Sequence, residues 1–164
     1  MKSRKLVIIL SWLCVLATMT MIFLFSSQNA EKSTETSTGF VEDVLQTVLP
    51  KDEVTPELVQ RTQMVIPFRK IAHFGIFMLL GFSLINAFRL TVNSKWYISY
   101  ICSFLSGVIY AITDEWHQNF IDGRGATYKD VLIDSAGVIV GIAVFAGFYY
   151  LDKYIKQKSK KPIK

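Results

Sequence analysis

Cysteine and histidine are scarce in this sequence of 164 residues, which contains two of each. Cys14 and Cys102 both fall inside apolar runs, where a thiol behaves as a small apolar group, so no disulfide framework is indicated. The zinc signature His-Glu-x-x-His is absent, and neither cysteine is well placed to complete a metal site. We therefore expect no metal and no cofactor.

Charge is nearly missing from four long segments, 6–25, 70–88, 96–114 and 131–151. About 20 apolar residues suffice to span a bilayer core, and 51% of the whole chain is hydrophobic, which is high for a soluble domain. The sequence therefore predicts an all-α, multi-pass four-helix bundle in the cell membrane. We place this single domain at residues 1–151.

Basic residues are divided unevenly between the two ends of these segments. The N-terminus, the connection 89–95 and the C-terminal stretch 152–164 carry eleven of the eighteen Lys and Arg residues, with a single acid, Asp152. Cytoplasmic loops are enriched in Lys and Arg, so we expect both termini in the cytoplasm and a basic cytoplasmic tail at 152–164. The net charge of +5 reflects this bias and predicts no nucleic-acid partner. The oligomeric state is left open.

The outer loop, residues 26–69, is the longest stretch outside these segments. Its Ser/Thr-rich beginning, 26–38, is expected to be mobile. Apolar residues then recur at helical spacing up to Pro50, and a second short helix is expected to begin with Thr55 as N-cap and Pro56 as its first residue. These two amphipathic helices could form a lid or a connector packed on the bundle.

The few ionisable residues near the apolar segments gather at the end opposite the termini. Charged groups close to hydrocarbon are costly unless they are paired, hydrated or functional. The second segment begins with Lys70 and His73, the third ends at Asp114, and the fourth begins beside Asp130. Three helices and a loop therefore contribute to one polar site on the extracytoplasmic side, as in other helical bundles.

Spacing at the end of the third segment suggests proton chemistry. If the helix continues to Gln118, then Asp114 lies one turn from both His117 and Gln118, whereas Glu115 points toward another helix. A carboxylate beside an imidazole orients the ring and raises its basicity, as a general base requires. His117, oriented by Asp114, is thus the expected base or nucleophile, with His73 as its partner acid.

Arg124, which stands between two glycines in the following loop, suggests an anion contact. Its planar guanidinium binds phosphate or carboxylate oxygens two at a time. Lys70 or Arg69 could provide a second contact. Together these groups are typical of a site for an anionic lipid head group.

Three alternatives follow from the same residues. The polar groups could be structural and pair helix ends together, an interpretation open above all for Asp134, one turn after Asp130. A divalent cation could be held by His73, by Asp114 or Glu115, and by His117. A proton pathway is disfavoured, because the cytoplasmic halves of the segments are almost purely apolar.

Five short motifs occur in order along the chain: FSSQ at 25–28, RKIAHF at 69–74, DEWHQNF at 114–120, GR at 123–124 and DVLIDSAG at 130–137. In this combination the sequence resembles the VanZ-like family of bacterial membrane proteins. In the last motif many members have Asn where this chain has Asp134.

The resemblance implies a four-helix membrane domain and a link to glycopeptide resistance, with teicoplanin for the name-giving member. It also implies kinship with membrane-embedded enzymes that act on lipid head groups, the partner being a membrane lipid or a lipid-linked cell-wall precursor. The catalytic residues would be His73, Asp114, Glu115, His117 and Asp130, and the substrate would be bound by Lys70, Gln118, Arg124 and Asp134. The alternative is a non-enzymatic protein that binds envelope lipid or limits glycopeptide access to its target.

Overall fold

The computed structural model describes residues 2–28, 30–50, 53–65, 68–92 and 95–159. Its elements there are six helices and no strands: α1 (Lys2–Ser26), α2 (Ala30–Val48), α3 (Pro56–Val65), α4 (Phe68–Thr91), α5 (Trp96–Gln118) and α6 (Tyr128–Ser159). Four of them, α1, α4, α5 and α6, are long and apolar enough to cross a membrane. The predicted all-α fold with four such helices is confirmed.

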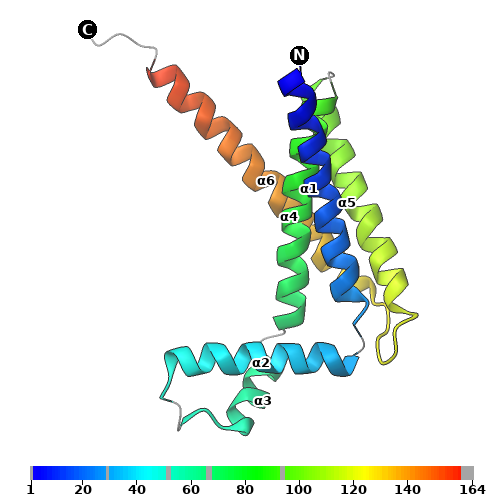
Figure 1. The fold of residues 1–164 in the computed structure, drawn as a ribbon, viewed down its shortest axis with the longest axis vertical. Helices are drawn as coiled ribbons and strands as arrows, with labels where there is room; N and C mark the ends of the chain where they lie inside the picture. The colour runs from blue at the N-terminus through cyan, green and yellow to red at the C-terminus, as the bar shows by residue number, and fades with distance from the viewer. Residues whose placement is uncertain (1, 29, 51–52, 66–67, 93–94, 160–164) are drawn as a thin grey trace.

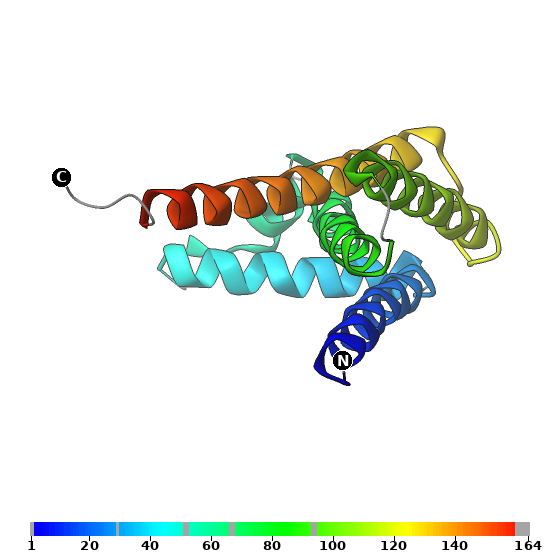
Figure 2. The ribbon, with the colours of Figure 1, turned by 90° about the horizontal axis from the view of Figure 1, so that it is seen from above.

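The long helices run up and down in chain order (Figure 1). The beginning of α1, the end of α4, the beginning of α5 and the end of α6 lie at one end of the bundle, and α6 leans away from the others toward its C-terminus. The α5–α6 loop lies at the opposite end, where α2 lies across the bundle (Figure 1). The view from above shows α4 between α1 and α6 (Figure 2).

Glycines allow α4 and α6 to pack backbone against backbone. A Cβ atom on Gly137 would lie 2.5 Å from the carbonyl oxygen of Phe74, and one on Gly141 would overlap the carbonyl oxygen of Met78. On the facing side, a Cβ atom on Gly81 of α4 would overlap the backbone of α6. Small residues at this spacing let membrane helices approach closely, so the position of His73, one turn before Phe77 in this seam, is firmly set.

The expectation of a mobile stretch at 26–38 is wrong for its second part, because α2 already begins at Ala30. The hydroxyl of Thr38 donates to the carbonyl oxygen of Thr34 at 2.8 Å, within the helix. Val41 is fully buried, and the centroids of the Phe40 and Phe68 rings are 5.8 Å apart. Packing of an apolar face stabilises a helix that composition alone does not favour.

The beginning of α3 and the end of α6 test two further predictions of helix boundaries. The backbone N–H of Leu58 donates to Thr55 Oγ1 at 3.3 Å and Pro56 opens α3, as the N-cap prediction required. The last helix continues to Ser159, so the first part of the stretch expected as a tail extends α6. The remaining tail residues, 160–164, lie outside the described ranges.

Candidate functional site

Buried polar side chains collect where α1, α4, α5 and α6 meet, near the crossing of α2. Asp114, Glu115, Gln118 and Asp134 are each no more than 4% exposed, and Ser26 is fully buried. The outer faces of the same helices carry exposed apolar residues instead. This end of the bundle therefore encloses a polar interior within an apolar exterior.

Asp114 is the centre of a hydrogen-bond network that joins α1, α5 and the α5–α6 loop. Its Oδ2 accepts hydrogen bonds from Ser26 Oγ at 2.8 Å and from Gln118 Nε2 at 3.2 Å. The carbonyl oxygen of Ser26 in turn accepts from Arg124 Nη1 at 2.9 Å. Sequence reasoning did not assign a role to Ser26, although it lies within the FSSQ motif.

Glu115 and Asp130 hold the beginning of α6. Glu115 Oε1 accepts from the backbone N–H of Thr127, the residue just before α6, at 2.7 Å. The Thr127 hydroxyl donates to Asp130 Oδ2 at 2.7 Å, and Lys70 Nζ contacts Asp130 Oδ1 at 2.5 Å. The cationic group of Lys70 is thus already paired with a carboxylate.

His73 lies beside two carboxylates from two other helices. Its Nδ1 is 3.9 Å from Asp134 Oδ2, and one possible ligand atom each from His73, Asp114 and Asp134 lie within 4.8 Å of one another. The helices α4, α5 and α6 contribute one residue each. The structure therefore gathers an imidazole and two buried carboxylates that are far apart in the sequence.

His117 faces a different part of the surface. Its ring stacks on that of Phe23, with the two ring centroids 4.9 Å apart, and its Nε2 is 3.3 Å from Ser27 Oγ. No hydrogen bond between His117 and Asp114 is observed in the described part of the chain, because the Asp114 side chain turns inward to Ser26. Both residues do line a hollow of about 280 Å³ with Tyr110, Trp116 and Phe120.

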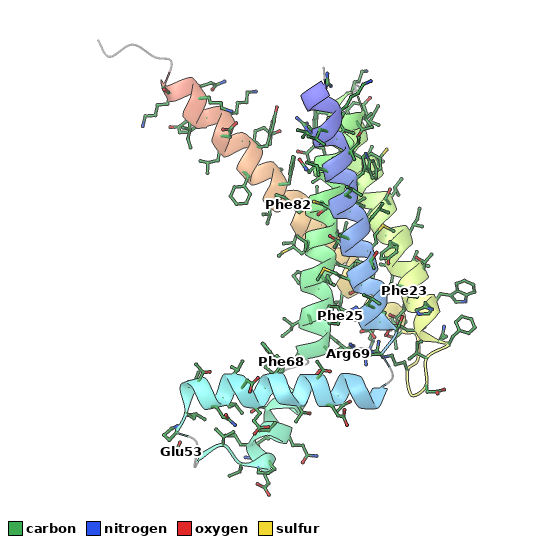
Figure 3. The ribbon with its side chains drawn as sticks, in the orientation of Figure 1. Phe23, Phe25, Glu53, Phe68, Arg69 and Phe82 are labelled. Carbon is green, nitrogen blue, oxygen red and sulfur yellow. The ribbon has the colours of Figure 1, made fainter. Side chains whose placement is uncertain are left out.

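A cavity of about 360 Å³ lies between α1, α2 and the beginning of α4. Its walls are mainly apolar, and its polar groups include His73, Arg69 and Arg124. Figure 3 shows Phe25, Phe68 and Arg69 around the junction of α1, α2 and α4. The apolar walls are formed by Phe25, Phe40, Phe68, Ile71, Ala72 and Ile76.

The guanidinium of Arg124 is only partly satisfied. Its Nη1 binds the carbonyl oxygen of Ser26, whereas its buried Nε has no hydrogen-bond partner among the described residues. Burial lowers the pKa of Arg124, and the nearby charge of Arg69 lowers it further. Both effects disfavour the charged form, so an anion bound in the cavity would stabilise it.

A family model described as VanZ/LLP1 matches residues 11–150. The matched range contains every residue of the polar network and of both cavities described above. No curated protein and no solved structure matches the chain.

Proposed function

Because this chain belongs to the VanZ-like family, we propose that it is a multi-pass protein of the cell membrane that acts on an anionic lipid head group or lipid-linked cell-wall precursor. The polar end of the bundle would face the extracytoplasmic side, in keeping with the excess of basic residues at the other end. The four apolar helices support the membrane location.

The apolar cavity that ends at His73, Arg69 and Arg124 is the observation that carries this proposal. Its volume of about 360 Å³ is within the range of small-molecule sites. Apolar walls suit an acyl or polyprenyl chain, and two guanidinium groups suit a phosphate. A water-soluble anion would gain nothing from the apolar walls, so a lipid is the better fit.

We place the reactive centre at His73, Asp114 and Asp134. His73 lines the cavity, whereas His117 lines the separate hollow beside Phe23. Arg124 and Arg69 would hold the head-group phosphate, with Gln118 and Ser26 fixing Asp114. In this arrangement Lys70 and Asp130 order the beginning of α6 rather than contact the substrate.

The test compares envelope lipids by mass spectrometry in deletion cells carrying the wild-type protein, His73→Ala or His117→Ala at matched abundance. We expect a head-group species that depends on the wild-type protein to be lost with His73→Ala and retained with His117→Ala. Loss with His117→Ala alone would return the catalytic role to the residue that the sequence favoured. Profiles in all three strains that match the deletion strain without the protein would refute enzymatic action.

A non-enzymatic binder is the second candidate, and the unsatisfied Nε atom of Arg124 favours it. Such a protein would hold envelope lipid or limit glycopeptide access, which is the proposed link to teicoplanin resistance. Its function would depend on the charge of Arg124 and not on the imidazole of His73. Teicoplanin susceptibility of cells carrying His73→Gln or Arg124→Gln separates the binder from the enzyme. A binder should retain its function with His73→Gln and lose it with Arg124→Gln, whereas the enzyme should lose its function with His73→Gln.

A further inference from the structure

The His73, Asp114 and Asp134 side chains have the composition of a metal site. Imidazole nitrogen and carboxylate oxygen together suit Zn²⁺ or Mn²⁺. Asp114 and Asp134 are nearly fully buried, and their ligand atoms lie within 4.8 Å of one another and of the His73 ring. With metal–ligand bonds of about 2.1 Å, donor atoms around one ion lie about 3.4 Å apart. Small side-chain rotations would bring the three ligand atoms from within 4.8 Å of one another to this separation.

Glu115 provides independent support for a ligand at this point. Its side chain is 3% exposed, and its Oε2 has no hydrogen-bond partner among the residues that the structure describes. A buried carboxylate oxygen left without a donor is costly. Together with His73 and Asp134, Glu115 lines a small polar cavity of about 10 Å³, space on the scale of one water molecule.

We infer that His73, Asp114 and Asp134 bind one divalent transition-metal ion, with Glu115 beside its open coordination position. Three protein ligands with an open fourth position are typical of catalytic rather than structural metal sites. The sequence had suggested His117 as a possible ligand, but the structure places that ring against Phe23 and brings Asp134 to His73 instead.

The bound ion would connect the buried acids with the lipid cavity. His73 and Arg69 line both the small polar cavity and the large apolar one. A cation on His73 would therefore lie next to the phosphate position proposed for Arg69 and Arg124, where it could polarise a phosphate oxygen or a bound water. This role rests on the proposed function, whereas metal binding itself does not.

The test uses the full chain in detergent, purified without a histidine tag, stripped with a chelator and then exposed to Zn²⁺ or Mn²⁺. We expect about one ion per chain by mass spectrometry of the eluted metal. His73→Ala and Asp134→Asn should bind more than about tenfold more weakly. His117→Ala and Asp122→Asn, which change the same residue types outside the cluster, should bind as the wild type does.

Thermal unfolding of the wild-type protein gives a second readout, which does not depend on how the variants fold. Added Zn²⁺ or Mn²⁺ should raise its Tm, and a chelator should reverse the increase, because a ligand that binds only the folded state stabilises it. Substoichiometric binding without a Tm shift, or full binding by His73→Ala, would overturn the inference. Metal binding together with unchanged envelope lipids would retain the metal site and refute the lipid enzyme.

Discussion

At the residue scale, the hydrogen bonds of the buried Asp114 side chain contribute to the stability of the polar end of the bundle. Ser26 Oγ and Gln118 Nε2 are the two side-chain donors to Asp114 Oδ2 observed in the described residues. Removing one donor from a buried acceptor is destabilising, because the lost hydrogen bond is not replaced by water. The first residue after the apolar run of α1 thus matters for the acid at the end of α5.

We expect Ser26→Ala to lower the free energy of unfolding by about 1–3 kcal/mol, because it removes a buried hydrogen bond to a carboxylate. Ser27→Ala is the matched control, since Ser27 is partly exposed and its hydroxyl contacts the carbonyl oxygen of Phe23 and the ring of His117. It should cost less than about 1 kcal/mol. Unfolding of both variants in detergent, measured side by side, checks the difference. Equal losses would contradict the role given to Ser26.

The seam between α4 and α6 is the element-level feature that positions the site. Phe77, Leu80 and Val138 are fully buried there, and Gly81, Gly137 and Gly141 keep the two backbones close. His73 and Asp134 project from the same pair of helices at the polar end of this seam. Any change in the helix separation would therefore move the imidazole relative to its carboxylate.

We predict that Gly141→Ala destabilises the protein by more than about 1 kcal/mol, because overpacking forces backbones apart. Its Cβ atom would overlap the carbonyl oxygen of Met78, whereas a Cβ atom on Gly147 of the same helix meets nothing within 4 Å. Gly147→Ala should be neutral or stabilising by up to about 1 kcal/mol, since alanine favours helix. Melting curves of the two single variants decide the matter, and a Gly141→Ala protein as stable as the wild type would disprove this packing.

At the scale of the whole molecule, the apolar outer faces of the helices are separate from the polar network at one end of the bundle. Exposed Leu, Ile and Phe side chains cover the outside of α1, α5 and α6, and the polar network lies at the end that also holds α2, α3 and the α5–α6 loop (Figure 1). This arrangement fits a bundle embedded in lipid with its polar end at the interface.

Both ends of the chain should be cytoplasmic and the α5–α6 loop extracytoplasmic. We expect single cysteines at Asp122 and at Lys153, introduced after replacing Cys14 and Cys102, to react differently with a membrane-impermeant maleimide. In intact cells Asp122→Cys should be labelled and Lys153→Cys should not, because the α5–α6 loop and the C-terminal part of α6 lie at opposite ends of the bundle and basic residues are in excess at the latter. Both should be labelled in broken cells. The reverse pattern in intact cells would invert the orientation.

Sequence reasoning succeeded where the signal is local. Apolar run length predicted the four long helices, and Thr55 with Pro56 predicted the beginning of α3. Composition failed at the beginning of α2, where the packing of Val41 and Phe40 stabilises a helix in a Ser/Thr-rich stretch. The contact between Asp114 and Gln118 was likewise predicted, because residues four apart lie one turn from each other on a helix.

By itself the sequence determined the family, the long apolar helices and the gathering of polar groups at one end, since hydropathy, motif order and the alternating direction of successive helices can be read along the chain without knowing how the helices pack. The tertiary structure decided the partners within that end. It brought His73 beside Asp134, stacked His117 on Phe23 and left a cavity between α1, α2 and the beginning of α4. Those choices depend on how α4 and α6 rotate and approach through their glycines, and no helical period in one segment specifies the rotation of another.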